Sequence, residues 1–169
     1  MSARSPRVIF PFSVIASARL AREQGFAYIW IDTCCIDKSS SAGLTEAINS
    51  MYQWYRDSAI CYAFLADVEP EREGKTIWAK DSSFKTSRWF RRGWTLQELV
   101  ASPLVSFYAR DWSFIESKTA VEGFTKLLST ITGIQQEILT GEKQPGDMSA
   151  ACRMGWAAGR QTTRVEDIA

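Results

Sequence analysis

Three short, largely apolar runs divide this chain, with helix-patterned segments between them. The runs are Phe26–Ile31, Ile60–Ala66 and Leu104–Tyr108, and aromatic and β-branched residues are frequent in them. Continuous apolar runs of this length are typical of strands buried on both faces of a sheet. Strands that alternate with helices indicate a parallel sheet flanked by helices. The sequence therefore predicts an α/β fold.

The segments between the runs carry apolar residues at helical spacing. In the clearest of them six residues share one stripe: Leu44, Ala47, Ile48, Met51, Tyr52 and Tyr55. Further helices are predicted at 12–24, 94–101, 116–129, 134–139 and 150–159, and another is expected to begin near residue 162. Residues 67–86 lack such a pattern and predict a mobile surface loop, which could serve as a lid. Three strands are few for such a sheet, so we expect its first strand to be missing unless the irregular segment 1–12 supplies one.

The absence of histidine excludes several kinds of site. None of the 169 residues is histidine, so the chain lacks the commonest general base and the commonest metal ligand. Catalysis by a Ser-His-Asp or Cys-His arrangement within this chain is therefore excluded. The 20 basic and 19 acidic residues give a net charge of +1, which provides no overall attraction to nucleic acid or to an anionic membrane.

The four cysteines predict an intracellular protein. They stand at Cys34, Cys35, Cys61 and Cys152, without a C-x-x-C pair. We expect buried, reduced thiols in a cytoplasmic protein, and no zinc site. The apolar stretch Val8–Ala18 is short and interrupted, so it predicts neither a transmembrane helix nor a signal peptide. Seven Trp, five Tyr and nine Phe predict a core dominated by aromatic packing.

The run SRWFRRGWTLQELVA, residues 87–101, has the most informative arrangement of side chains. Its helical part places Leu96, Leu99 and Val100 on one inward face. Trp94 and Glu98 are four residues apart, so they lie one turn from each other. A carboxylate beside an indole, preceded by several arginines, would suit a cationic or nucleotide-like ligand. An ordinary surface helix that docks through its tryptophan has the same pattern, so both interpretations stay open.

Two aspartates follow the first predicted strand. Asp32 and Asp37 stand where α/β sheets usually place functional loops. Either could bind a ribose or orient a partner. Alternatively, the two carboxylates cap the turn and the helix that follows it.

Four longer motifs carry a family resemblance. In order they are WIDTCCID, AINSMYQWY, RGWTLQEL and RQTTRVEDIA, and together they resemble the HET domain of fungal heterokaryon-incompatibility proteins over residues 13–169. The resemblance implies a role in non-self recognition, in which incompatible fungal cells that fuse are killed. It implies a death-inducing effector that assembles with itself or with other incompatibility proteins, with no nucleic-acid or membrane partner. The family normally has a histidine-containing first strand and continues past the last motif, so we expect a truncated or degenerate copy.

A second resemblance bears on mechanism. The order of elements and the Trp-x-x-x-Glu-Leu pattern look like TIR domains, in which a glutamate supports cleavage of NAD between nicotinamide and ribose. The likeness implies that Glu98 is the catalytic carboxylate, that Trp94 stacks beside it and that Asp32 lies at the ligand edge of the sheet. The residues that would meet the pyrophosphate are Arg88, Arg91 and Arg92, although a solvated or interdomain basic face explains them equally. NAD would be a substrate, and no other cofactor or metal is implied.

Three functions follow from these patterns. The chain is an assembly module, an NAD-cleaving hydrolase that depends on Glu98, or an inactive fragment. For the assembly module, the candidate contact residues are Trp78, Trp89, Trp112 and the loop at 67–86, because aromatic residues dominate binding hot spots.

Overall fold

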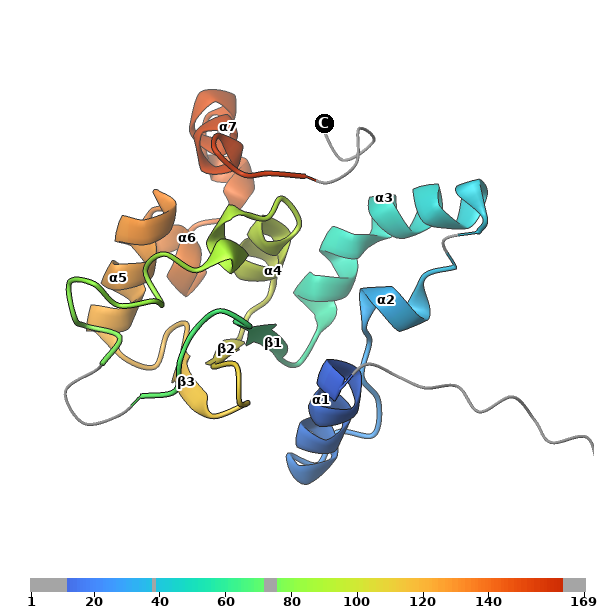
Figure 1. Ribbon diagram of the computed structural model, residues 1–169. Coiled ribbons are helices and arrows are strands. Elements are labelled where there is room, and N and C mark those ends of the chain that lie inside the picture. Colours follow the sequence, from blue (N-terminus) through green and yellow to red (C-terminus); the bar gives the residue numbers. More distant parts are fainter. Residues whose placement is uncertain (1–11, 38, 72–75, 163–169) are drawn as a thin grey trace, which may run out of the picture. The chain divides into compact units, whose positions relative to one another are not determined.

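A computed structural model describes residues 12–37, 39–71 and 76–162 of the chain. The chain divides into two compact units, residues 1–47 and 48–169, which are coloured in sequence order in Figure 1. The predictions made for the irregular segment 1–12 and for a helix beginning near residue 162 fall almost entirely outside the described residues.

The first unit is helical. It contains α1 (Phe12–Glu23), α2 (Asp32–Cys35) and the beginning of α3 (Ser41–Asp57), which continues into the second unit. The predicted helix at 12–24 is confirmed, and Gly25 ends it with a φ of +86°. The predicted water-facing side of α3 is also confirmed, because Glu46, Asn49, Gln53 and Arg56 are all exposed.

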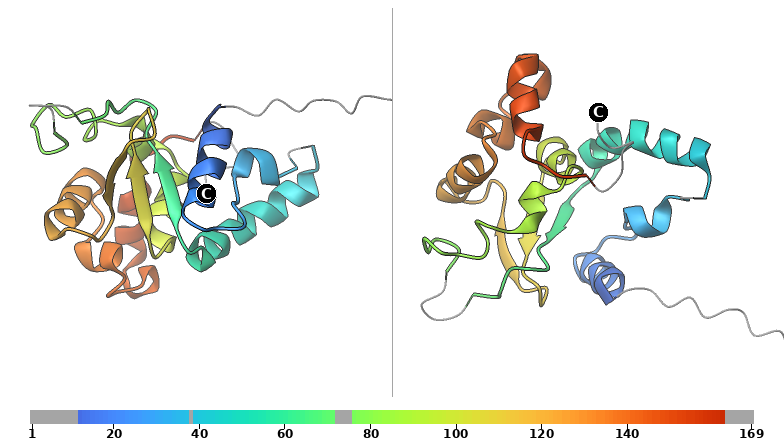
Figure 2. Two further views of the ribbon diagram at one scale, coloured as in Figure 1. Left: turned by 90° about the horizontal axis from the view of Figure 1, so that it is seen from below. Right: turned by 45° about the horizontal axis from the view of Figure 1, so that its top comes forward.

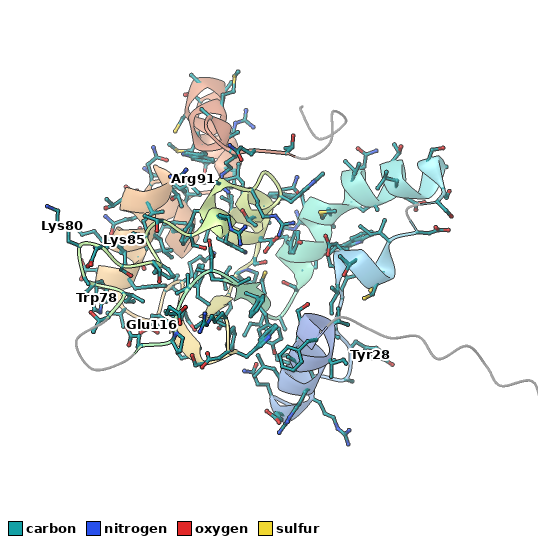
Figure 3. The ribbon with its side chains drawn as sticks, in the orientation of Figure 1. Tyr28, Trp78, Lys80, Lys85, Arg91 and Glu116 are labelled. Carbon is teal, nitrogen blue, oxygen red and sulfur yellow. The ribbon has the colours of Figure 1, made fainter. Side chains whose placement is uncertain are left out.

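The predicted buried strand at Phe26–Ile31 is wrong. These residues form neither a strand nor a helix, and Tyr28, labelled in Figure 3, is 93% exposed. The described residues of the first unit contain no strand that could pair with this run. A strand needs main-chain partners, and an apolar pattern alone does not supply them.

The second unit contains a small mixed sheet in the order β1-β2-β3. Its strands are β1 (Cys61–Phe64), β2 (Val105–Tyr108) and β3 (Phe114–Ser117). Strands β1 and β2 are parallel, as predicted, with Cys61 opposite Val105. Strand β3 is antiparallel to β2, with Ser106 opposite Ser117, so the prediction of a wholly parallel sheet is wrong. The fold is mixed α/β.

A tight turn explains the direction of β3. Only residues 109–113 separate it from β2, and so short a connection can join only antiparallel neighbours. Trp112 closes this turn with a φ of +66°, a conformation that bulky side chains rarely adopt. The sequence predicted a helix from residue 116, but residues 116 and 117 belong to β3 and the helix begins at Glu122.

The helices that follow β1 gather on one side of the sheet (Figures 1 and 2). They are η1 (Arg88–Arg91), α4 (Thr95–Ala101), α5 (Glu122–Thr132), α6 (Gln136–Thr140), η2 (Pro145–Asp147) and α7 (Ala150–Ala157). The predicted helices at 94–101, 134–139 and 150–159 are confirmed. For the helix predicted at 116–129, the inward-facing side is confirmed at Phe124 and Leu128, which are fully buried in α5. Val121, which was also predicted to face inward, is 46% exposed.

Aromatic rings fill the core of the second unit, as the composition predicts. Phe107 of β2 lies edge-on to Phe84 and Phe124, with ring centroids 5.8 and 5.5 Å away. Phe84 comes from the segment 67–86, which forms no helix or strand in its described parts. This segment is nevertheless attached to the core, because Phe84 is fully buried and Ile77 is 6% exposed.

The thiols only partly match their prediction. All four cysteines are free, but Cys34 and Cys35 are exposed, whereas Cys61 is buried and Cys152 is half-buried. The exposed pair lies on α2, a single helical turn with no buried residue. Among the described helices, none has the length and apolar character needed to cross a bilayer.

Candidate functional site

Two motifs that are far apart in the sequence meet at the beginning of α4. The N–H of Gln161 donates to the carbonyl oxygen of Arg91 at 2.6 Å, and the N–H of Gly93 donates to that of Gln161 at 3.0 Å. Gly93 is required by this close approach, since a Cβ there would lie 2.6 Å from Cγ2 of Thr162. The RGWTLQEL segment and residues 160–162 therefore form one structural unit.

Arg160 holds these segments together. Its Nε donates to the carbonyl oxygen of Trp156 at 3.1 Å. Its Nη1 donates to the carbonyl oxygen of Arg92 and to Oγ1 of Thr95, each at 3.0 Å. Thr95 is 1% exposed, and its hydroxyl donates to the carbonyl oxygen of Trp89 at 2.6 Å. One guanidinium thus joins the end of α7, the turn before α4 and the first turn of α4.

Glu98 lies on α4 about one helical turn after Thr95, the residue that Arg160 binds. It is half-buried, and its backbone N–H donates to the carbonyl oxygen of Trp94 at 3.4 Å. Burial lowers the pKa of Arg160 to about 10, and the negative charge of Glu98 opposes that shift. Burial also raises the pKa of the Cys61 thiol, and here the charge of Glu98 acts in the same direction. The carboxylate therefore lies within electrostatic range of both Arg160 and Cys61.

A buried lysine fixes the other end of α4. Lys118 is 2% exposed, and its Nζ donates to the carbonyl oxygens of Leu99 at 3.1 Å and Ser102 at 2.6 Å. A cation at these carbonyls also complements the helix dipole. Burial lowers the pKa of Lys118 to about 8. Because Arg160 binds one end of α4 and Lys118 the other, the backbone that carries Glu98 is held at both ends.

The three predicted phosphate-binding arginines have different surroundings. Arg88 is bound to Asp67, whose Oδ2 accepts from the Arg88 backbone N–H at 2.8 Å and lies 3.4 Å from its Nε. Burial alone would raise the pKa of Asp67, but hydrogen bonds from Arg88 and Ser87 outweigh it and lower that pKa. Arg91, labelled in Figure 3, and Arg92 are exposed, and neither side chain forms an ion pair within the described ranges.

Of the predicted site residues, the structure brings Arg91, Arg92, Trp94 and Glu98 together along one turn and the beginning of one helix. Trp94 is half-buried and is the residue immediately before α4. Its backbone carbonyl accepts the N–H of Glu98, which places the two residues one turn apart as predicted.

Asp32 belongs to the first unit, whereas this group lies in the second. It is the first residue of α2, and its Oδ1 accepts the N–H of Thr33 at 2.7 Å. Asp37 accepts the backbone N–H and the hydroxyl of Ser39, at 2.9 and 2.6 Å. The bonds of Asp37 agree with the predicted capping of the turn, but neither aspartate caps a helix: α2 has no side-chain cap, and the N–H of Gly43 near the start of α3 donates to Oγ of Ser40. A ribose contact at Asp32 stays a prediction. Over the described parts of the chain, no three His, Cys, Asp or Glu side chains are placed to hold a metal ion.

Sequence reasoning missed two residues of the site, Lys118 and Arg160. Arg160 stands at the start of the RQTT segment, so that motif gave a signal for it without indicating a role. Lys118 had no signal, because it lies in a segment predicted to be helical and its partners are carbonyl oxygens of another element.

The comparisons with known proteins agree with the motifs. The family model "Heterokaryon incompatibility protein (HET)" matches residues 8–80. The chain is 43% identical over 152 residues to "Vegetative incompatibility protein HET-E-1" of Podospora anserina. That alignment covers 88% of the chain and 11% of the relative, so the chain spans only a small part of the relative's length. No solved structure matches the chain. The chain therefore belongs to the heterokaryon incompatibility (HET) family, as its motifs indicated.

Proposed function

We propose that this chain is an effector domain of fungal vegetative incompatibility, which triggers cell death after non-self recognition by assembling with copies of itself or with other incompatibility proteins. The observation that carries the proposal is the 43% identity to a vegetative incompatibility protein over 88% of the chain. An alignment of that extent leaves out about one eighth of the chain, so it extends across the region of α4.

The surface of the second unit supports assembly through Trp78. This indole is 50% exposed, and its ring lies edge-on to Phe124 with centroids 6.5 Å apart (Figure 3). The Nζ of Lys85 donates to the carbonyl oxygens of Trp78 and Ala79 at 3.1 and 2.8 Å, so the loop around the ring is held in place. An exposed tryptophan on a fixed backbone is typical of a binding hot spot.

The other two tryptophans proposed for assembly differ from Trp78. Trp89 is 6% exposed and packs in the core against Phe107, so its ring is not available to a partner. Trp112 is half-buried and stacks on Phe64 with ring centroids 4.5 Å apart. Trp78 is therefore the contact residue to test.

Forced assembly in fungal cells tests this function. The chain is fused to a domain that dimerises on addition of a small molecule and is expressed from an inducible promoter. We expect the small molecule to arrest growth and kill cells, and Trp78→Ala to reduce killing at equal protein level. Survival at the parent's full expression level, with dimerisation verified in extracts, would contradict the proposal.

NAD cleavage is a second candidate function, favoured by the surroundings of Glu98. The carboxylate lies near Arg160 on a helix held at both ends, and Arg91 and Arg92 are exposed in the preceding turn. Cleavage breaks the bond between ribose C1′ and the nicotinamide nitrogen, and the bonding electrons leave with nicotinamide. A carboxylate stabilises the resulting oxocarbenium-like ribose, and water then adds to C1′ and releases a proton. Neither step requires histidine.

The variant Glu98→Gln separates the two functions in the same cells. It is nearly isosteric and leaves the exposed surface at Trp78 unchanged. If killing depends on NAD cleavage, Glu98→Gln abolishes killing while dimerisation continues. If assembly alone is the signal, Glu98→Gln kills as well as the parent.

A further inference from the structure

We propose that Cys34 and Cys35 form a peroxide-sensitive dithiol site, at which oxidation joins the two sulfurs in a reversible disulfide and unwinds α2. The site belongs to the first unit, and it depends on neither of the functions proposed above. The observations that carry it are the exposure of both thiols and the small number of contacts that hold the single helical turn on which they lie.

Cys34 and Cys35 are the thiols of this chain that solvent reaches most easily. Both are exposed, whereas Cys61 is buried and Cys152 is half-buried. A peroxide oxidises a cysteine only where it has access to the thiolate, so the exposed pair should react before the other two. The pair also suits an oxidation in two steps, because an adjacent thiol can resolve the sulfenic acid that the first step produces.

The contacts of the two sulfurs are local. Sγ of Cys35 accepts the main-chain N–H of Ile31 at 3.4 Å. Sγ of Cys34 lies 3.8 Å from Oγ1 of Thr33, the preceding residue. Among the described residues, neither sulfur has a hydrogen-bond partner outside the segment 31–35. The oxidation therefore breaks no contact between distant parts of the chain.

The spacing of the two cysteines couples the disulfide to the conformation of α2. Neighbouring side chains of a helix diverge by about 100° around its axis. Adjacent Cα atoms are about 3.8 Å apart, which is shorter than the roughly 4.4–6.8 Å that ordinary disulfides span. The sulfurs of Cys34 and Cys35 can therefore join only after the turn leaves its helical conformation.

Few interactions oppose this change in α2. The N–H groups of Cys34 and Cys35 donate to the carbonyl oxygen of Ile31 at 3.0 and 2.8 Å. The N–H of Ile36 donates to the carbonyl oxygen of Asp32 at 3.3 Å. The helix has no side-chain cap and no buried residue. Since no apolar side chain leaves a core when the turn opens, water replaces these main-chain bonds at small cost.

The reaction balances with hydrogen peroxide as the oxidant. In the first step a thiolate sulfur attacks one peroxide oxygen and the O–O bond breaks, which gives a sulfenic acid and a hydroxide that takes up the proton released by the thiol. In the second step the neighbouring thiol attacks the sulfenic sulfur, the S–O bond breaks and a second water leaves. Two electrons pass from the sulfurs to the peroxide. The short spacing strains the disulfide, so a thiol reductant opens it readily and the turn can re-form.

A thiol of a second copy of the chain competes with the neighbouring thiol. The neighbour belongs to the same chain, so its effective concentration does not depend on the protein concentration. A disulfide between two copies does depend on that concentration, and it needs no change in α2. Dilution therefore separates the two products.

The test is oxidation of the purified whole chain by hydrogen peroxide over a dilution series. Remaining thiols are blocked with N-ethylmaleimide, and intact mass, non-reducing electrophoresis and peptide mapping locate the product. In the parent we expect, at every dilution, a monomer that has lost two hydrogens in the peptide containing Cys34 and Cys35, with full reversal by dithiothreitol. The carbon-13 Cα shifts of residues 33–35 should move from helical to non-helical values. Cys152→Ser, the matched control that keeps the pair, should respond as the parent does.

Cys34→Ser and Cys35→Ser each keep one thiol of the pair and should lose both the internal product and the change in Cα shifts. Disulfide-linked dimers as the main product of the parent at the highest dilution would overturn the inference. So would a parent whose exposed pair still reacts with N-ethylmaleimide after its other thiols have been oxidised. An internal disulfide that leaves the Cα shifts of α2 unchanged would overturn the unwinding. These outcomes are read from the parent, so none of them requires a variant to fold.

Discussion

The apolar runs at Phe26–Ile31 and Ile60–Ala66 look alike in the sequence, yet only the second contains a strand. In the second unit β2 gives β1 a parallel partner over its whole length, from Cys61 opposite Val105 to Phe64 opposite Tyr108. The described part of the first unit has no strand to pair with the earlier run. The difference shows that an apolar pattern indicates the ability to form a strand, whereas main-chain partners decide whether one forms.

The largest expected difference in stability is between a substitution in the core of the second unit and one in the unpaired run of the first unit. Phe107→Ala removes a fully buried ring that contacts Phe84 and Phe124, and should lower the free energy of unfolding by about 3–5 kcal/mol. Tyr28→Ala, at a residue 93% exposed, should change it by less than about 0.5 kcal/mol. Urea unfolding of both variants measures the difference. Equal losses would show that the run at 26–31 is packed as tightly as the core.

Lys118 gives the second unit a specific dependence on pH. Burial lowers its pKa from 10.5 to about 8, so between these values the unfolded chain binds the proton and the folded chain does not. Burying the charged ammonium lowers the free energy of unfolding, and this cost is fully present below about pH 8. It disappears as the pH rises towards 10.5. Relative to Lys118→Met, which does not titrate at this position, the parent should gain on the order of 2–3 kcal/mol of stability over this range. Unfolding midpoints that change in parallel for both proteins would contradict this role.

The close approach at Gly93 predicts a strain that a second substitution relieves. Gly93→Ala places a methyl group 2.6 Å from Cγ2 of Thr162 and should cost about 1–3 kcal/mol. Thr162→Ser removes that Cγ2, so the double variant should recover most of the loss, as a double-mutant cycle in urea would measure. Additive effects of the two substitutions would mean that the RGWTLQEL and RQTT segments do not meet.

The smallest expected effect concerns Asp67, which binds the beginning of η1. Asp67→Asn should cost about 1 kcal/mol near neutral pH, because the ionised acceptor of the Ser87 hydroxyl and the Arg88 N–H is lost. The pKa of Asp67 is lowered in the folded chain, so its contribution is complete above the unfolded value of about 3.8 and disappears as pH falls through the folded value. The difference in stability between parent and variant should therefore shrink in acid. A constant difference from pH 7 to pH 2 would contradict this assignment.

Particular residues show what the sequence could and could not predict. Helical spacing predicted α4 because Leu96, Leu99 and Val100 share one side, and the helix in turn placed Trp94 and Glu98 one turn apart. Strand β3 was missed because Phe114-Ile115-Glu116-Ser117 is a half-polar edge strand that follows a turn with Trp112 at positive φ. Such a turn has no sequence signal, since glycine usually occupies that conformation.

The residues that hold α4 in place were harder to predict than the candidate site residues themselves. Glu98, Trp94 and Arg91 lie within one local motif, so sequence spacing was enough to group them. Arg160 and Lys118 act on α4 through hydrogen bonds that cross 65 and 19 positions of sequence. Their partners are mostly backbone carbonyls, which every residue has, so no pattern of side chains could reveal these contacts.

The most direct test of the enzymatic role assigned to Glu98 is NAD consumption by the purified chain, concentrated or tethered to force assembly. Glu98→Gln is measured beside it, with Glu142→Gln at an exposed residue as the matched control. We predict that the parent and Glu142→Gln consume NAD and release nicotinamide, whereas folded Glu98→Gln does not. Consumption by Glu98→Gln at the parent's rate, or no consumption by any assembled sample, would contradict the role of Glu98 as the catalytic carboxylate.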